Sequence, residues 1–189
     1  MAVGARHRDV RLTRDGILAA ALKIIDADGV EALSMRKLAA DLDVNPMSLY
    51  HHVENKAALL DGVTALVTAG ASKVAVGDGT WRQQLHKLAY AFRALSLEHP
   101  HLIRYAFMSD DYIQRGGPMW VSLCAILRTA GLPPQEAEQV GAVLAALIGG
   151  LLLTEVNGTM RRLIGTSDAE DTGFALAVWL LIDGVAARV

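Results

Sequence analysis

The stretch SMRKLAADLDVNPMSLYHHV, residues 34–53, decides the fold of the N-terminal part of this chain. Ser34 precedes one helical pattern, and Asn45 with Pro46 at the first helical position begins a second, short helix. Asp43 stands in the turn between them. The stretch therefore has the spacing of a helix-turn-helix.

The two helices of this motif separate apolar from polar side chains. The positions that can pack inward against a preceding helix are Leu38, Leu42, Val44, Leu49 and Val53. The positions directed outward are Asn45, Met47, Ser48, His51 and His52, with Tyr50 at an edge. A short helix that offers polar side chains from its first turns suits the major groove of DNA. Taken alone, the histidine pair is equally typical of a solvated surface, and adjacent histidines without a third ligand predict no metal site.

The rest of the chain is patterned almost entirely as α-helix, with no convincing strand alternation. We therefore predict an all-α protein of about nine helices. Besides the two helices of the motif, they cover about 14–28, 56–76, 81–97, 102–108, 119–130, 135–156 and 169–187. We place the domain boundary before residue 56. Residues 1–55 form an N-terminal arm and a three-helix domain, and residues 56–189 form a connecting helix and a helical bundle.

Composition and charge exclude several classes of protein. The chain has 189 residues, of which 52% are hydrophobic, and a net charge of −2, which argues against a histone-like packer of nucleic acid. Its single cysteine, Cys124, cannot form an internal disulfide and lies in an apolar stretch, so we expect it to be buried and inert. The longest uncharged run, 139–154, has 16 residues, fewer than the ~20 of a membrane-spanning helix. With no secretory signal, the sequence predicts a cytoplasmic protein.

Residues 13–60 resemble the DNA-binding region of the tetracycline-repressor (TetR) family of transcriptional regulators. The most specific part is the run Leu49-Tyr50-x-His52-Val53-x-Asn55-Lys56. The other residues that carry the resemblance are Ile17, Ala20, Ala21, Gly29, Ser34, Met35, Arg36, Leu38, Ala39, Leu42, Val44, Leu59 and Leu60. Residues 81–156 look like the C-terminal domain of the tetracycline-repressor-like branch. There the resemblance rests on Trp81, His99-Pro100-His101-Leu102 and Ala130-Gly131-Leu132-Pro133.

This resemblance implies a sequence-specific regulator, a repressor that binds a palindromic operator as a homodimer and is released by a small molecule. It implies a left-handed turn at Asp43, where relatives usually have glycine. Aspartate tolerates that backbone better than most residues other than glycine, so we expect a small strain and an unchanged fold. The resemblance also implies roles for individual residues. Arg36 would contact a base or a phosphate, and Lys37 is a weaker phosphate candidate. The residues of the reading helix would be Asn45, Pro46, Met47, Ser48 and His51. The residues at positions that clamp phosphates are Tyr50, His52 and Lys56.

The charge of the N-terminal part limits how it could bind DNA. Residues 1–56 hold eight Lys or Arg and eight Asp or Glu, so affinity must come from individually placed cations. The arm differs, because through residue 14 it has four arginines against Asp9 alone. These arginines are Arg6, Arg8, Arg11 and Arg14. Such an arm can enter the minor groove, and the alternative is a disordered, solubilising tail.

Large apolar side chains in the C-terminal part are candidates for an effector pocket. These candidates are Phe92, Tyr105, Met108, Tyr112, Met119, Trp120 and Leu123. Taken singly, each of them is more typical of ordinary core. The break at Gly116-Gly117-Pro118 could form the entrance of a pocket, and the effector would be a small apolar or amphipathic molecule.

The segments 135–156 and 169–187 hold more apolar residues than one bundle face requires. We interpret the surplus as a two-fold dimer interface, a four-helix bundle with two helices from each subunit, as the resemblance also implies. The predicted interface residues are Leu144, Leu147, Ile148, Leu151, Val178, Trp179 and Ile182. The alternative is burial within one chain.

Two other functions stay open as alternatives. An enzyme would need a nucleophile with a base, a metal cluster or a phosphate-binding loop, and the sequence has no such signature, so we expect no catalysis, metal or cofactor. The second alternative is a module that sequesters a small molecule or binds a protein and no longer binds DNA. It stays open because residues 1–56 carry no net charge. A salt titration of binding to random DNA separates it from a DNA-binding regulator.

Overall fold

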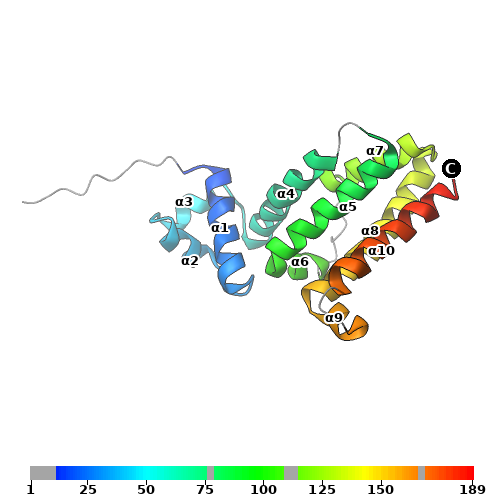
Figure 1. Cartoon of the computed structure of the whole chain (residues 1–189). Helices are drawn as coiled ribbons and strands as arrows, with labels where there is room; N and C mark the ends of the chain where they lie inside the picture. The colour runs from blue at the N-terminus through cyan, green and yellow to red at the C-terminus, as the bar shows by residue number, and fades with distance from the viewer. Residues whose placement is uncertain (1–11, 76–78, 109–114, 166–168) are drawn as a thin grey trace, which may run out of the picture. The chain divides into compact units, whose positions relative to one another are not determined.

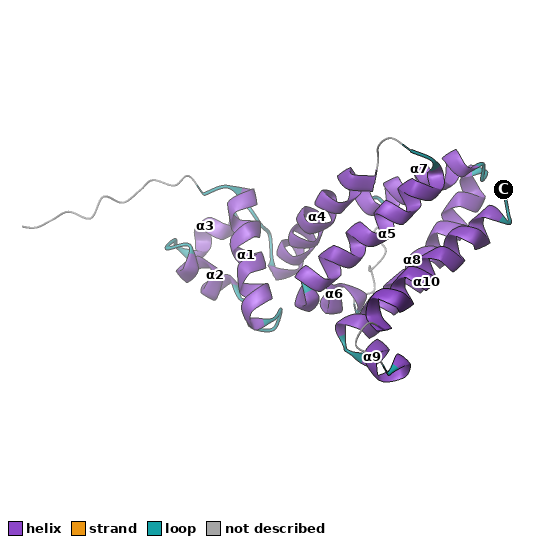
Figure 2. Cartoon of the chain, in the orientation of Figure 1, coloured by secondary structure: helices purple, strands orange, loops and turns teal. Residues whose placement is uncertain are grey.

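The computed structural model describes residues 12–75, 79–108, 115–165 and 169–189 (Figure 1). Within these ranges the chain contains ten α-helices and no strand (Figure 2). It forms two compact units, one that ends at Val63 and one that begins at Thr64. The sequence analysis placed the boundary before residue 56, where α4 begins, whereas the two units meet inside this helix.

The first unit contains α1 (Arg14–Asp28), α2 (Met35–Asp41), α3 (Pro46–Tyr50) and the start of α4 (Lys56–Ala75). A side-chain oxygen caps each of these helices by accepting a backbone N–H at 2.9–3.1 Å. The capping residues are Thr13, Ser34, Asn45 and Asn55. These helix starts are the ones that the sequence predicted. The helix α3 is shorter than expected, because it ends at Tyr50 and His51 already lies beyond it.

The turn between α2 and α3 has the left-handed backbone that the sequence predicted. Asp43 has a φ of 53°, the one positive value among the described residues other than glycine. The next residue, Val44, donates its backbone N–H to the carbonyl of Ala39 at 2.9 Å. Asp43 therefore sets the angle at which α3 leaves α2, at the cost of some backbone strain.

The core of the first unit is built around α1, whose six buried residues recur at helical spacing. From the motif, Leu38, Leu49 and Val53 are buried as expected, whereas Leu42 and Val44 are half-buried. Gly62 of α4 lies close to α1, since a Cβ added there would come within 2.8 Å of the Leu18 side chain.

The second unit contains the rest of α4 and six further helices. They are α5 (Trp81–Glu98), α6 (Pro100–Phe107), α7 (Pro118–Ala130), α8 (Pro134–Val156), α9 (Thr159–Ile164) and α10 (Ala169–Ala186). The sequence analysis did not predict α9. This six-residue helix lies between Gly158 and Gly165, both with positive φ. Such a short helix has too little hydrophobic periodicity to detect.

A buried ion pair ties three helices of this unit together. Arg93 of α5 donates to both carboxylate oxygens of Glu155 in α8, with Nε at 2.9 and 3.0 Å, and its Nη2 also contacts Glu155. The guanidinium lies 5.0 Å from the ring centre of Phe174 in α10. The two charged side chains are 11% and 3% exposed, so each depends on the other for charge compensation.

The helix α8 is long and apolar enough to cross a membrane, by length and composition alone. The core helix of a soluble protein passes the same test, so this is weak evidence. Its most apolar 18-residue window has a mean hydropathy of 1.8, and 33% of that window is buried within the chain. Much of the apolar surface of α8 is therefore left uncovered in a single copy.

Candidate functional site

The short helix α3 presents most of its side chains to solvent. The fully buried side chain of Leu49 anchors it in the core of the first unit. The exposed residues are Asn45, Pro46, Met47, Tyr50, His51 and His52, and Ser48 is half-buried. Met47 is the most exposed large apolar side chain of this unit, at 66%. The structure thus brings the predicted reading residues together on one solvent-facing surface, called the reading surface below.

Asn45 has a structural role as well as a place on the reading surface. Its side-chain oxygen accepts the backbone N–H of Met47 at 2.9 Å and so caps α3. The amide nitrogen of the same side chain carries two N–H donors, which no contact in the cap requires. Asn45 can therefore hold the helix start and offer donors outward at the same time.

The side chains predicted to contact phosphates differ in the contacts that they make within the unit. Arg36 of α2 is exposed. Lys37, by contrast, forms an exposed ion pair with Asp28 at 2.6 Å, and Lys56 donates its Nζ to the carbonyl of Val30 at 2.9 Å. These two lysines hold α2 and α4 to the end of α1, a use that the sequence analysis did not foresee.

One residue of the predicted arm belongs to the described part of the chain. Arg14 is exposed at the start of α1. Arg6, Arg8 and Arg11 lie outside the described residues.

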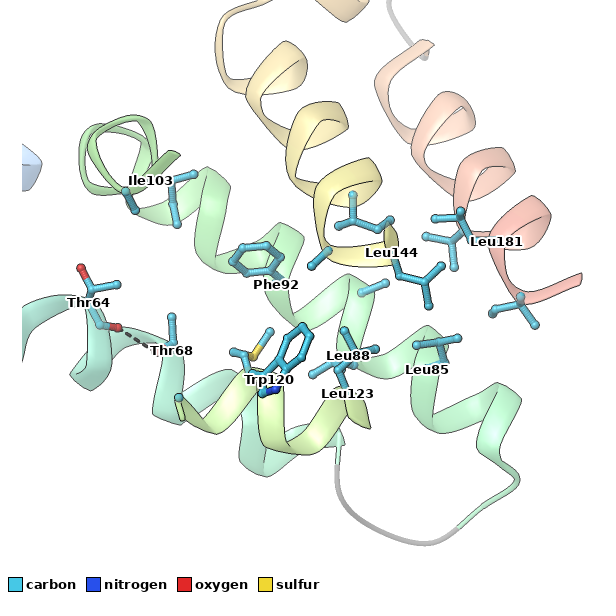
Figure 3. A pocket seen from close by; sticks show the side chains of 18 residues that line it. Thr64, Thr68, Leu85, Leu88, Phe92, Ile103, Trp120, Leu123, Leu144 and Leu181 are labelled. Carbon is cyan, nitrogen blue, oxygen red and sulfur yellow. Dashed lines mark hydrogen bonds between the residues drawn. The ribbon is translucent and has the colours of Figure 1, made fainter. Parts of the chain in front are cut away.

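The second unit contains a cavity of about 160 Å³ between α4, α5, α6, α7, α8 and α10 (Figure 3). The side chains of Phe92 and Trp120 project into it from α5 and α7. The other lining residues are Thr64, Thr68, Leu85, Leu88, Ala89, Ile103, Ala106, Gly117, Met119, Leu123, Leu144, Ala145, Ile148, Val178, Leu181 and Ile182.

The lining is apolar apart from three side chains. Thr64, Thr68 and Trp120 carry a polar side-chain atom, and no charged residue lines the cavity within the described ranges. The hydroxyl of Thr68 donates to the carbonyl of Thr64, one turn earlier in α4, at 2.8 Å (Figure 3). Sequence reasoning missed both threonines. The signal that could have found them is their spacing of four, which puts two hydroxyls on one face of an apolar helix.

Four of the predicted pocket residues line the cavity: Phe92, Met119, Trp120 and Leu123. Tyr112 lies outside the described residues. Tyr105 and Met108 do not line the cavity and are 36% and 82% exposed.

The reason lies in the orientation of α6. This helix turns Ile103 and Ala106 toward the cavity, three residues apart on one face. Tyr105 therefore lies on another face, and Met108 follows the last residue of the helix.

The predicted dimer residues divide between two faces of α8 and α10. Leu144, Ile148, Val178 and Ile182 line the cavity, and Leu144 and Val178 are buried within the single chain. Half-buried Leu151 packs against the core cluster around Phe174. Residues four apart share a helix face, so Leu144 and Ile148 look inward together.

Two of the predicted interface residues remain exposed. Leu147 and Trp179 are 52% and 58% exposed, and three further apolar side chains of the same helices, Val143, Leu176 and Leu180, are exposed to a similar degree. These five residues are called the apolar strip below. Each of them exposes more than half of its side chain to water in a single copy.

Cys124 is buried in α7, as the sequence predicted. Burial raises the pKa of its thiol above the ordinary value, and this exceeds the opposing effect of Arg128. The thiol is therefore protonated near neutral pH and is a poor nucleophile. Among the described residues no group of three or more His, Cys, Asp or Glu could hold a metal ion.

Two family models match the chain. Residues 17–63 match "Bacterial regulatory proteins, tetR family", and residues 75–162 match "Tetracyclin repressor-like, C-terminal domain". The first match contains the reading surface. The second overlaps the part of the chain that supplies most of the cavity.

Curated proteins and solved structures agree with these matches. The HTH-type transcriptional repressor DrrR1 of Streptomyces coeruleorubidus is 43% identical over 94 residues, which are 49% of this chain and 35% of the relative. The tetracycline repressor protein class A of Escherichia coli is 29% identical over 94% of this chain and 92% of the relative. The matches to DrrR1 and to two further curated relatives each cover less than half of the relative's length.

The solved structure of apo ActR from Streptomyces coelicolor superimposes with a TM-score of 0.77 at 29% identity. The match covers 93% of this chain and 95% of that one. ActR is also known in complex with (S)-DNPA and with actinorhodin. These relatives are regulatory proteins rather than enzymes. Both family models, the relatives and the helical architecture lead to one conclusion: the chain belongs to the tetR family of bacterial regulatory proteins.

Proposed function

We propose that this chain is a transcriptional repressor that binds an inverted-repeat operator as a homodimer and leaves it when a small apolar or amphipathic molecule binds. The observation that carries the proposal is the reading surface. A short helix anchored by buried Leu49 presents exposed Met47 and Tyr50, and the exposed polar side chains of Asn45, His51 and His52 flank it. This arrangement suits entry into a major groove.

Base recognition would come from the reading helix, through Asn45, Pro46, Met47, Ser48 and His51. Arg36 would contact a base or a phosphate, and Tyr50 and His52 would contact phosphates. Lys37 and Lys56 would contribute less than a free lysine, because each already has a partner within the unit. The arm residues Arg6, Arg8, Arg11 and Arg14 would bind the minor groove or wrap the backbone.

Dimerisation would bury the apolar strip. The strip lies on α8 and α10, and α8 has only a third of its most apolar window buried within one chain. Covering the strip with a second copy would contribute roughly 25 cal/mol per Å² of apolar surface, before the cost of association. A two-fold dimer reads an inverted repeat when its two reading surfaces are about 34–36 Å apart, which is one turn of DNA.

The cavity supports the small-molecule part of the proposal. It is formed inside the unit that also carries the apolar strip, and ActR, similar in fold and at 29% identity, is known with bound small molecules. A ligand releases DNA only if it binds the protein better in a state that does not fit the operator. By reciprocity, operator DNA would weaken ligand binding by the same factor.

The place of action follows from the partner. A soluble protein that binds operator DNA in a bacterium acts in the cytoplasm, and we place this chain there.

Binding to random-sequence duplex across a salt series tests the proposal. Affinity should fall steeply, with a log–log slope of about −0.9 for each phosphate contacted. Arg36→Ala should make that slope shallower by about one contact, whereas Arg128→Ala, which removes an exposed charge from the other unit, should leave it unchanged. A slope near zero for the wild-type chain would contradict the proposal and favour a module that sequesters small molecules.

A further inference from the structure

We infer that the effector is an uncharged molecule with a body about the size of a single ring and one hydrogen-bond donor, such as a phenol or a small alcohol. This inference rests on the proposed function, because it takes the cavity as the effector site. It adds the chemical class of the ligand, which the volume, the lining and one hydroxyl of the cavity define.

The size comes from the volume. A dry apolar cavity of about 150 Å³ is known to bind benzene, so the roughly 160 Å³ found here accommodates a ring of similar size. Phe92 and Trp120 project into it from α5 and α7, so that an aromatic ligand can contact two aromatic faces (Figure 3). A multi-ring ligand would have to displace core side chains.

The side chains that line the cavity indicate that the ligand carries no charge. The described lining residues carry no charge, and the nearby ion pair of Arg93 and Glu155 is already satisfied by its own bidentate contacts. A carboxylate placed among leucine, isoleucine and aromatic side chains would lose its hydration without a cation to replace it. An acid of the same shape should therefore bind at least about 100-fold more weakly than the neutral ligand.

The hydroxyl of Thr68 is the reason why the ligand must carry a hydrogen-bond donor. A threonine hydroxyl has one proton and two lone pairs. Thr68 directs its proton along α4 to the carbonyl of Thr64, at 2.8 Å, or to that of Ala65, at 3.3 Å. Because its proton is engaged in the helix, the hydroxyl can only accept a hydrogen bond from the cavity. The ligand group that pairs with it must then donate.

Four probes of one shape separate these requirements by calorimetry on the full chain: 4-ethylphenol, ethylbenzene, 4-ethylanisole and 4-ethylbenzoate. The phenol should bind about 3- to 10-fold more tightly than the hydrocarbon and the ether, the range for one neutral hydrogen bond, and the benzoate should not bind measurably. Thr68→Val should remove the preference for the phenol and retain the affinity for ethylbenzene.

Thr129→Val is the matched control. Thr129 makes the same kind of hydrogen bond, to the carbonyl of Ala125 at 3.0 Å, but does not line the cavity. This variant should keep the full preference for the phenol.

Three results would overturn the inference: benzoate binding as tight as that of the phenol, equal affinity for phenol and ether in the wild type, or a phenol preference that survives Thr68→Val. Failure to bind any of the four probes would overturn it as well. DNA binding in the salt titration is independent of these probes. Loss of DNA binding with intact phenol selectivity would therefore reject the proposed function alone.

Discussion

The two units of this chain build their candidate sites in opposite ways. In the first unit, the reading surface lies within residues 45–52, on one short helix and at its two ends, around a single buried leucine. In the second, the cavity is assembled from side chains of helices α4 to α8 and α10, with contributions more than 100 residues apart in the sequence. The first site therefore depends on local structure, and the second depends on tertiary packing.

This difference determines which kind of substitution should disrupt each site. A local site is lost when its anchor or its helix cap is lost, whatever happens elsewhere. A packed cavity is lost when the contacts that fix the relative positions of its helices are lost, even when no lining residue changes. Four substitutions test this contrast.

The largest effect is expected at the buried ion pair. Arg93→Met leaves the carboxylate of Glu155, 3% exposed, without its cation, which should lower the free energy of unfolding of the second unit by about 3–5 kcal/mol in urea denaturation. The double variant Arg93→Met with Glu155→Leu should recover most of that loss. Arg82→Met breaks the exposed pair with Asp183 and should cost less than about 1 kcal/mol. Equal losses at the two arginines would mean that the buried pair does not hold the helices.

The anchor of the reading surface comes next. Leu49→Ala should lower the free energy of unfolding of the first unit by about 2–5 kcal/mol, because the removed side chain is fully buried. Affinity for DNA should fall with it, while calorimetric binding of ethylbenzene to the cavity should stay unchanged. Met47→Ala, at an exposed position of the same helix, should not alter unfolding. Loss of ethylbenzene binding in Leu49→Ala would contradict the independence of the two sites.

The helix caps predict a smaller effect that separates stability from recognition. Ser34→Ala and Asn45→Ala each remove one cap hydrogen bond and should each cost about 1 kcal/mol in thermal or urea unfolding. Only Asn45→Ala should also change which DNA sequences are preferred, because Ser34 has no expected base contact. A change in sequence preference for both variants would show that the caps act on DNA only through helix position.

The smallest effect is expected in the turn. Asp43→Gly should raise the free energy of unfolding by up to about 1 kcal/mol, since glycine adopts a φ of 53° without the strain that a Cβ causes. Asp41→Gly, at the end of α2 in a helical conformation, should instead lower it. Destabilisation by Asp43→Gly would show that the aspartate side chain makes a favourable interaction in the turn.

The same contrast explains what could be predicted from the sequence. The helix starts after Ser34 and Asn45 and the turn at Asp43 depend on residues at most three positions apart, so the sequence predicted all of them. The motif likewise predicted that Leu49 points inward and Met47 outward, because a helix-turn-helix defines both faces.

The cavity could not be predicted to the same extent. Tyr105 and Met108 were assigned to it as large apolar residues, but the orientation of α6 excludes them in favour of Ile103. Leu144 was assigned to a dimer interface for the same reason, although it faces inward. The hydrophobicity of such residues predicts that they are buried. Only the packing of neighbouring helices determines which part of the molecule buries them.

Selection of bound DNA from a random library with the purified chain tests the central claim most directly. We expect an inverted repeat whose half-sites are centred about one helical turn apart. Met47→Ala should shift the preference at one base pair in each half-site, whereas Met108→Ala, also at an exposed position but in the other unit, should select the wild-type sequence. Selection of no consensus, of a single unrepeated site, or of the same sequence by Met47→Ala would contradict the assignment of the reading surface.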